Sequence, residues 1–124
     1  MDEEKIKEEY AEFQKTFPGM SNMVILDGEG KVIFSLQPDF MSDEDAQNML
    51  DMWKNQKSPL TLAGKRYVVL KWDDIQFASK NVKDKTAIIG SICKSGNRCV
   101  VEYTGSGNLL QSTIDLNRWC YSRL

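Results

Sequence analysis

The side chains of this chain that could do chemistry are lysines, carboxylates and three thiols, because the sequence contains no histidine. That absence removes the commonest general base, the commonest metal ligand and the usual activator of a serine or cysteine nucleophile. Cys93, Cys99 and Cys120 lack the spacing of a disulfide framework, so we interpret them as buried free thiols in a reducing compartment. Cys93 and Cys99 could also face each other across a hairpin, which leaves a disulfide geometrically open.

The acidic clusters and the glycine-rich segment have structural explanations that need no catalysis. Asp73 and Asp74 fit a turn, and Asp43–Asp45 fit the first turn of a helix, where the helix dipole favours carboxylates. Neither group offers the convergent oxygens of a metal site. Gly105–Gly107 lacks the further glycine or the Gly-Lys-Ser/Thr ending of a phosphate loop and is expected to lead from a strand into a helix. We therefore expect no cofactor, no metal and no enzyme, with lysine or carboxylate catalysis as the least favoured alternative.

The charged residues are segregated along the chain. Residues 1–52 carry 4 basic and 13 acidic side chains, whereas residues 54–98 carry 10 basic and 3 acidic ones. The basic residues of the middle segment are Lys54, Lys57, Lys65, Arg66, Lys71, Lys80, Lys83, Lys85, Lys94 and Arg98. Such an excess creates a field that steers an acidic partner. Nucleic acid is not predicted, because the net charge is −2 and the sequence has no RNP-like aromatic motif or zinc knuckle.

Length and composition predict one folded domain covering residues 1–124. A chain of 124 residues with 41% apolar and 27% charged side chains buries enough surface to fold without a metal or disulfide. The acidic N-terminus is unlike a signal peptide, and the longest apolar run, Ala87–Ile92, is too short to span a bilayer. We therefore expect a cytoplasmic protein.

Hydrophobic periodicity predicts three helices, at residues 4–17, 42–55 and 109–124. In the first helix, Ile6, Tyr10, Phe13 and Phe17 share one face. Ser42 begins the second helix with an acid three residues later, as in a capping box. The apolar face predicted for the third helix consists of Leu110, Ile114, Asn117 and Tyr121, with Leu109, Leu116 and Cys120 close by.

Alternating patterns between turn residues predict the strands, at residues 23–26, 31–36, 60–62, 65–72, 75–81, 85–94 and 98–103. Short turns join most of them, which favours antiparallel pairing. The predicted fold class is therefore α+β. A central antiparallel sheet of about six to seven strands carries the terminal helices on one face and the middle helix on the other.

The chain resembles the profilin family along nearly its whole length. Met23–Asp27 and Lys31–Ser35 resemble the first profilin hairpin, Ser42–Trp53 the middle helix, and Leu60–Tyr67 a family strand–turn–strand. Its divergence resembles that of profilins from archaea with eukaryote-like cytoskeletons. The resemblance implies a non-catalytic monomer that binds actin monomers and regulates actin polymerisation in the cytoskeleton. It also implies the family's other ligands, which are proline-rich peptides and the head groups of anionic phospholipids such as phosphoinositides.

The same resemblance implies two sets of binding residues. Carried over by position, the actin-binding set is Arg66, Lys71, Lys80, Gly105, Ser106, Asn108, Gln111 and Ser112. The polyproline-binding set is Tyr10, Trp119 and Tyr121, while Ile6 or Lys7 and Ile33 stand where the family has tryptophans. Lys83, Lys85 and Lys94 are interpreted as solvated neighbours of the actin-binding set.

Two readings from the residues remain open beside the resemblance. The aromatic residues of the first and last helices could form a groove for proline-rich peptides or simply pack against the sheet. The order of helices and strands also fits a roadblock- or longin-like dimer that regulates small GTPases. A stable homodimer in solution would favour that second fold, and a monomer would favour a profilin.

Overall fold

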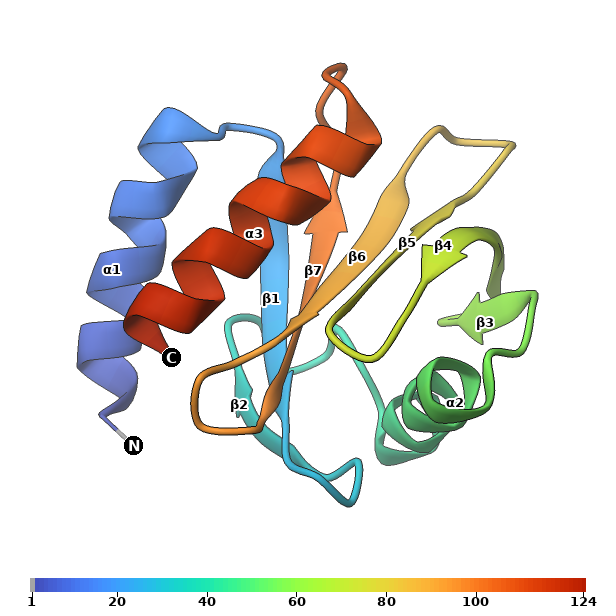
Figure 1. Ribbon diagram of the computed structural model, residues 1–124, viewed down its shortest axis with the longest axis horizontal. Helices are drawn as coiled ribbons and strands as arrows, with labels where there is room; N and C mark the ends of the chain where they lie inside the picture. The colour runs from blue at the N-terminus through green and yellow to red at the C-terminus, as the bar shows by residue number, and fades with distance from the viewer. Residues whose placement is uncertain (1) are drawn as a thin grey trace.

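A computed structural model describes residues 2–124 of the chain as three helices and seven strands (Figure 1). In chain order these are α1 (Glu3–Thr16), β1 (Met20–Leu26), β2 (Val32–Ser35), α2 (Asp43–Asn55), β3 (Leu60–Leu62), β4 (Lys65–Trp72), β5 (Gln76–Lys80), β6 (Ala87–Ile92), β7 (Arg98–Tyr103) and α3 (Leu109–Arg123). Each predicted element is present, and β3 and β4 have the predicted bounds.

The seven strands form one antiparallel sheet in the order β2-β1-β7-β6-β5-β4-β3. Among the strands of residues 2–124, all neighbours in the sheet are consecutive in the chain except β1 and β7. Their pairing joins the two ends of the chain. The predicted antiparallel sheet is therefore confirmed. Its edge strands are β2 and β3, which are short, as is usual for strands that must resist pairing with other chains.

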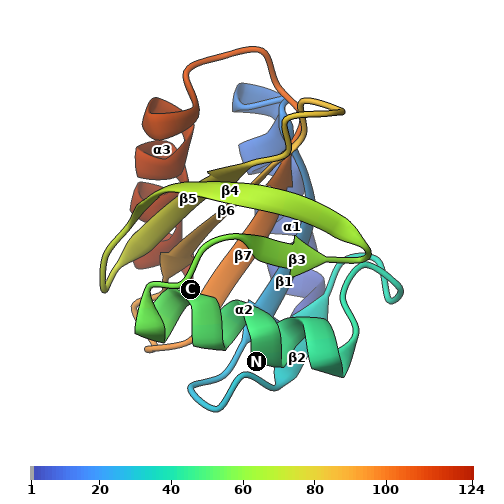
Figure 2. The same ribbon diagram turned by 90° about the vertical axis from the view of Figure 1, so that its right-hand side faces the viewer.

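The helices lie on opposite faces of the sheet, as predicted. Side chains of α1 and α3 share one buried cluster with β1, β6 and β7, and Tyr10, Phe13 and Trp119 lie at its centre. Side chains of α2 share a second cluster with β3, β4 and the other side of β7, around Trp53 and Phe77. Figure 2 shows α2 alongside β3, away from α3. The sheet is therefore buried on both faces around its centre.

Each helix begins at a side chain that accepts a hydrogen bond from its own first turn. Asp2 accepts from the Lys5 amide at 3.2 Å, and Asn108 accepts from the Gln111 amide at 3.0 Å. Ser42 and Asp45 form the predicted capping box. Such caps satisfy amides that have no partner within the helix, and each typically contributes about 1 kcal/mol.

The predicted apolar face of the last helix is wrong. The buried side chains of α3 are Ser112, Thr113, Leu116, Trp119 and Cys120. Leu110, Ile114 and Tyr121 are exposed, and Asn117 is only half-buried. The helix carries two apolar stripes, and the stripe containing Trp119 is buried because it faces the aromatic residues of α1. The stripe of Leu110 and Ile114 is left on the surface.

The three thiols are free and buried, which confirms the reading as buried thiols and excludes the hairpin disulfide in this structure. Cys99 lies opposite Ser91 rather than Cys93, because the turn brings Cys93 opposite Asn97. Hydrogen bonding to Cys120, with burial, raises the pKa of Cys93, and burial chiefly raises the pKa of Cys120. Both thiols are therefore protonated packing groups at neutral pH.

Gly90 in β6 offers a test of how tightly the α2 side of the sheet is packed. A Cβ atom at this position would overlap the ring of Phe77 and lie 3.0 Å from Trp53. We expect Gly90→Ala to lower the free energy of unfolding by about 1–3 kcal/mol, as overpacking does. Urea unfolding measures the change. Gly28→Ala is the control, since a Cβ there meets no atom within 4 Å, and equal effects of the two variants would contradict the packing.

Candidate partner-binding face

One part of the sheet carries no helix on the α3 side. α3 packs on β6 and β5, and Figure 1 shows β4 lying beyond it without a helix in front. We call this surface the open face. It consists of the exposed side chains of β4 and β5 and the neighbouring flank of α3: Arg66, Val68, Leu70, Lys71, Lys80, Leu110 and Ile114.

The register of β4 and β5 sets which side chains reach the open face. Val68 pairs with Lys80, and Lys71 pairs with Ala78, whose side chain lies in the core beneath α1 and α3. Directly paired residues of antiparallel strands point to the same side of the sheet. A bulge between Val69 and Lys71 interrupts the alternation, so that Lys71 lies on the same side as Val68, and Leu70 between them is exposed as well.

The open face combines apolar side chains with unpaired cations. Leu70 is 56% exposed, Leu110 48%, Val68 40% and Ile114 36%. Single exposed apolar residues are normal on a protein surface, whereas a gathering of them marks an interaction site. Arg66, Lys71 and Lys80 are also exposed, and none of them makes an ion pair within residues 2–124. The surface therefore suits a partner that is apolar at its centre and acidic around it.

An ion pair anchors the loop at one end of the open face. Lys65 lies 2.7 Å from Asp84, whose carboxylate also accepts hydrogen bonds from Thr86. Lys65, with Thr86, holds the pKa of Asp84 well below its usual range, and Asp84 raises the pKa of Lys65. The charge of Lys65 is thus balanced, so the cations available to a partner are its neighbours.

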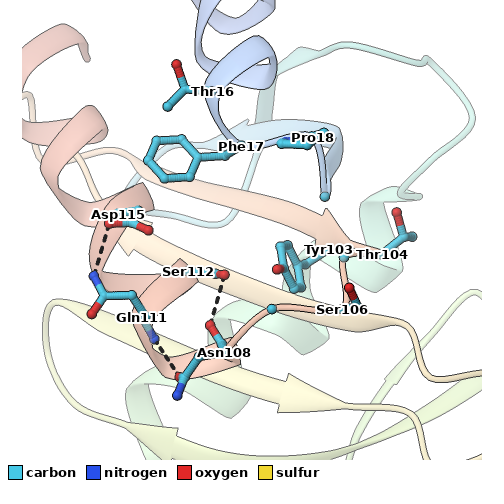
Figure 3. A pocket seen from close by; sticks show the side chains of 13 residues that line it. Thr16, Phe17, Pro18, Tyr103, Thr104, Ser106, Asn108, Gln111, Ser112 and Asp115 are labelled. Atoms are coloured by element: carbon cyan, nitrogen blue, oxygen red, sulfur yellow. Dashed lines mark hydrogen bonds between the residues drawn. The ribbon is translucent and has the colours of Figure 1, made fainter.

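The predicted residues at the start of α3 line a hollow of about 630 Å³ against the end of α1 (Figure 3). Figure 3 shows Phe17, the residue after α1, on one side, with Gln111 and Asp115 of α3 on another. Asn108 caps α3, and the Ser112 hydroxyl donates to the Asn108 carbonyl at 3.0 Å. The side-chain amide of Gln111 donates to the Asp115 carboxylate at 3.1 Å. These side chains hold the start of the helix, and Ser112 is buried in the floor of the hollow.

A second, smaller hollow joins the two parts of the predicted actin-binding set. It measures about 240 Å³ and contains Lys80 of β5 together with Gly105 and Ser106 of the loop before α3. We call it the junction hollow. Arg66 lines a separate hollow with residues of the 81–84 loop, and Lys71 lies further along β4. The predicted residues are thus divided among three hollows and one strand position rather than forming one pocket.

Comparisons with known proteins bear on this geometry. No protein-family model matches the sequence. Loki profilin-3 of Lokiarchaeum sp. (strain GC14_75) is 29% identical over 106 residues, which cover 84% of this chain and 86% of that protein. This chain is therefore similar to an archaeal profilin over most of its length.

Solved profilin structures share the fold. The crystal structure of LokiProfilin1 has a TM-score of 0.79 at 14% identity and covers 98% of this chain and 96% of its own. LokiProfilin2, solved in complex with rabbit actin, has a TM-score of 0.78 at 12% identity, covering 97% and 95%. Acanthamoeba castellanii profilin II has a TM-score of 0.69 at 15% identity, covering 86% of each chain. These likenesses do not favour the roadblock- or longin-like alternative.

Two of the three predicted polyproline-binding residues, Tyr10 and Trp119, pack in the space between α1 and α3. Tyr10 is fully buried, and its hydroxyl donates to the Ser21 carbonyl at 2.8 Å. Trp119 packs edge-on against Tyr10, with ring centroids 5.5 Å apart, and stacks on Phe13 at 5.0 Å. Tyr121 is exposed on the stripe of α3 that carries Leu110 and Ile114. The three residues therefore present no shared platform for proline rings.

Sequence reasoning missed the apolar part of the open face. It placed Leu110 and Ile114 in the core and left the orientation of Val68 and Leu70 unassigned. Counting the apolar residues of α3 gives a usable signal, since they are too many and too widely spread for one buried stripe. The bulge that exposes Leu70 has no comparable signal in the sequence.

None of the helices within residues 2–124 is long and apolar enough to cross a bilayer. In the same part of the chain, no three His, Cys, Asp or Glu side chains are grouped so that they could hold a metal ion.

The anchoring ion pair predicts a pH-dependent difference in stability. The pKa of Asp84 lies below its ordinary value of 3.8 in the folded protein, so its contribution is present above that pH and is lost on acidification. We expect Asp84→Asn to be less stable than the wild type at pH 7, and the difference to shrink as the pH falls below 4. Urea midpoints from pH 7 to pH 3 measure it. Asp74→Asn is the control, and a difference independent of pH would contradict the ionic origin.

Proposed function

We propose that this protein binds actin monomers through the open face and thereby regulates actin polymerisation. The observation that carries the proposal is the gathering of exposed apolar side chains and unpaired cations on the part of the sheet that no helix covers. The likeness to LokiProfilin1 and LokiProfilin2, both solved in complex with rabbit actin, supports the choice of partner.

The chemistry of the face suggests how the complex forms. Removing Val68, Leu70, Leu110 and Ile114 from water supplies the driving force, at about 25 cal/mol per Å² of apolar surface. Arg66, Lys71 and Lys80 surround them and accelerate encounter with an acidic surface. A bound profilin covers one end of the actin monomer and leaves the other end free to join a filament.

The remaining parts of the proposal follow from the family. Profilins are known as non-catalytic proteins, and we infer that this one is non-catalytic, monomeric and cytoplasmic, acting with the actin cytoskeleton. The cations of the open face are also the groups that would contact an anionic phospholipid head group. The buried rings of Tyr10 and Trp119 argue against tight binding of proline-rich peptides.

A polymerisation assay with actin from the same source organism tests the proposal. The protein at a several-fold excess over monomer is expected to slow spontaneous filament formation and to be retained by actin in a pull-down. Unchanged polymerisation together with no retention would reject actin as the partner.

Charge reversal on the open face should weaken the complex. We expect Lys71→Glu with Lys80→Glu to reduce affinity for actin about tenfold at low salt, mainly through slower association, and to reduce the salt dependence. The matched control is Lys31→Glu with Lys94→Glu, which changes the net charge equally but alters the hairpin turns elsewhere. Association rates at several salt concentrations measure both. Equal losses of actin affinity in the two variants would mean that affinity depends on the net charge and not on the open face.

The apolar side chains of the open face should contribute to actin affinity independently of the salt concentration. Leu70→Ser with Leu110→Ser is expected to weaken actin binding by about 2 kcal/mol, since two partly exposed leucines lose the surface that they would bury. Both positions are exposed, so the urea midpoint should stay nearly unchanged. Calorimetric titration at low and high salt checks the effect. Normal affinity in this folded variant would remove the apolar centre from the interface.

A further inference from the structure

The junction hollow is built on a row of paired residues that crosses three strands. Lys80 of β5 pairs with Ala87 of β6, which pairs with Tyr103 of β7. Because paired residues point to the same side, all three face the α3 side of the sheet. Ala87 is the small member of the row, so a space remains between the longer side chains. Leu109, at the start of α3, completes the wall.

The polar groups around the junction hollow are nearly all hydrogen-bond donors. Lys80 and Lys85 line it together with the hydroxyls of Tyr103 and Ser106, and no carboxylate is among its lining residues. Neither lysine forms an ion pair within residues 2–124. Asp84, the carboxylate next to Lys85 in the chain, is engaged by Lys65 at 2.7 Å. The hollow therefore carries two uncompensated positive charges.

The Tyr103 hydroxyl is the least expected of these donors. Its side chain is 8% exposed, and its hydroxyl lines the hollow without being sealed from water. Gly105 and Gly107 pass directly over it, and a Cβ atom on either would crowd the hydroxyl. The hydroxyl is not buried from solvent and faces the hollow, where it is free to donate a hydrogen bond to a ligand.

Lys85 is held toward this site by a turn in an unfavourable conformation. Its φ angle is 63°, a left-handed value that costs a non-glycine residue of order 1 kcal/mol or more. The Asn81 side chain accepts hydrogen bonds from the amides of Lys83 and Asp84 at 2.8 and 3.0 Å, which fixes the turn. The position of Lys85 is thus set by the fold rather than by chance.

We propose that the junction hollow receives one carboxylate side chain of the actin partner. The inference rests on the proposed function, since the hollow joins the two parts of the predicted actin-binding set. Two ammonium groups and two hydroxyls can satisfy both oxygens of a carboxylate, and Ala87 and Leu109 can contact its methylene groups. Lys85 and Tyr103, which sequence reasoning left out of the binding set, become specificity-determining residues.

Two conservative variants and one control test the inference through actin affinity. Lys85→Gln is expected to weaken binding about tenfold, and Tyr103→Phe about threefold to tenfold, because each removes a donor to a charged group. Lys94→Gln is the control, since it removes the same charge at the opposite end of β6 and should change affinity less than twofold. Tyr103→Phe should keep the urea midpoint of the wild type, because its hydroxyl has no protein partner to lose.

The outcomes separate this inference from the proposed function. If the wild type binds actin and both variants bind like Lys94→Gln, the inference is overturned while the proposed function stands. If the wild type does not bind actin, the proposed function fails, and titration with sodium acetate followed by amide NMR shifts still tests the hollow. Saturable shifts at residues 105–107 that disappear in Lys85→Gln would support a carboxylate site. Shifts spread over all lysine-bearing turns would overturn it.

Discussion

The pairing of β1 with β7 is the constraint on which the rest of the structure depends. These strands come from opposite ends of the chain, and α1 precedes the first while α3 follows the second. Both terminal helices must therefore cover the same central part of the sheet, where Tyr10, Phe13 and Trp119 pack together. With two helices placed there and α2 on the opposite face, none remains for the α3 side of β4, so the open face is a consequence of the topology.

The same topology places the acidic and the basic segments of the sequence in different elements of the fold. The acidic part of the chain supplies α1 and α2, while the basic part supplies β3 to β6, including the uncovered strands. Ion pairing then determines which of these cations remain available. Asp84 balances Lys65, whereas Lys80 and Lys85 have no counterions within the described residues. A partner therefore meets a surface whose positive charge is concentrated beside exposed apolar side chains.

Periodicity and capping residues were enough to place the helices to within about one residue and to predict antiparallel strands, because these signals are local. The pairing of β1 with β7 was not predicted, since it joins the two ends of the chain. The buried stripe of α3 could not be predicted, since both stripes are apolar and the choice depends on the rings of α1, more than ninety residues away. The junction hollow is also non-local, because it needs Lys80, Ala87 and Tyr103 in one row. The burial of Tyr10 is non-local for the same reason, since a residue carried over by position is exposed or buried according to the rings around it.

The second apolar stripe of α3 shows how one helix serves stability and binding together. Trp119 and Leu116 attach it to the core, so the helix stays in place without help from Leu110 and Ile114. Those two residues leave apolar surface in water, which stabilises nothing in the free protein. Their exposure is therefore best explained by burial in a complex. The same reasoning applies to Lys85, since its left-handed backbone conformation is a local cost of the free chain that binding of a single acidic side chain could offset.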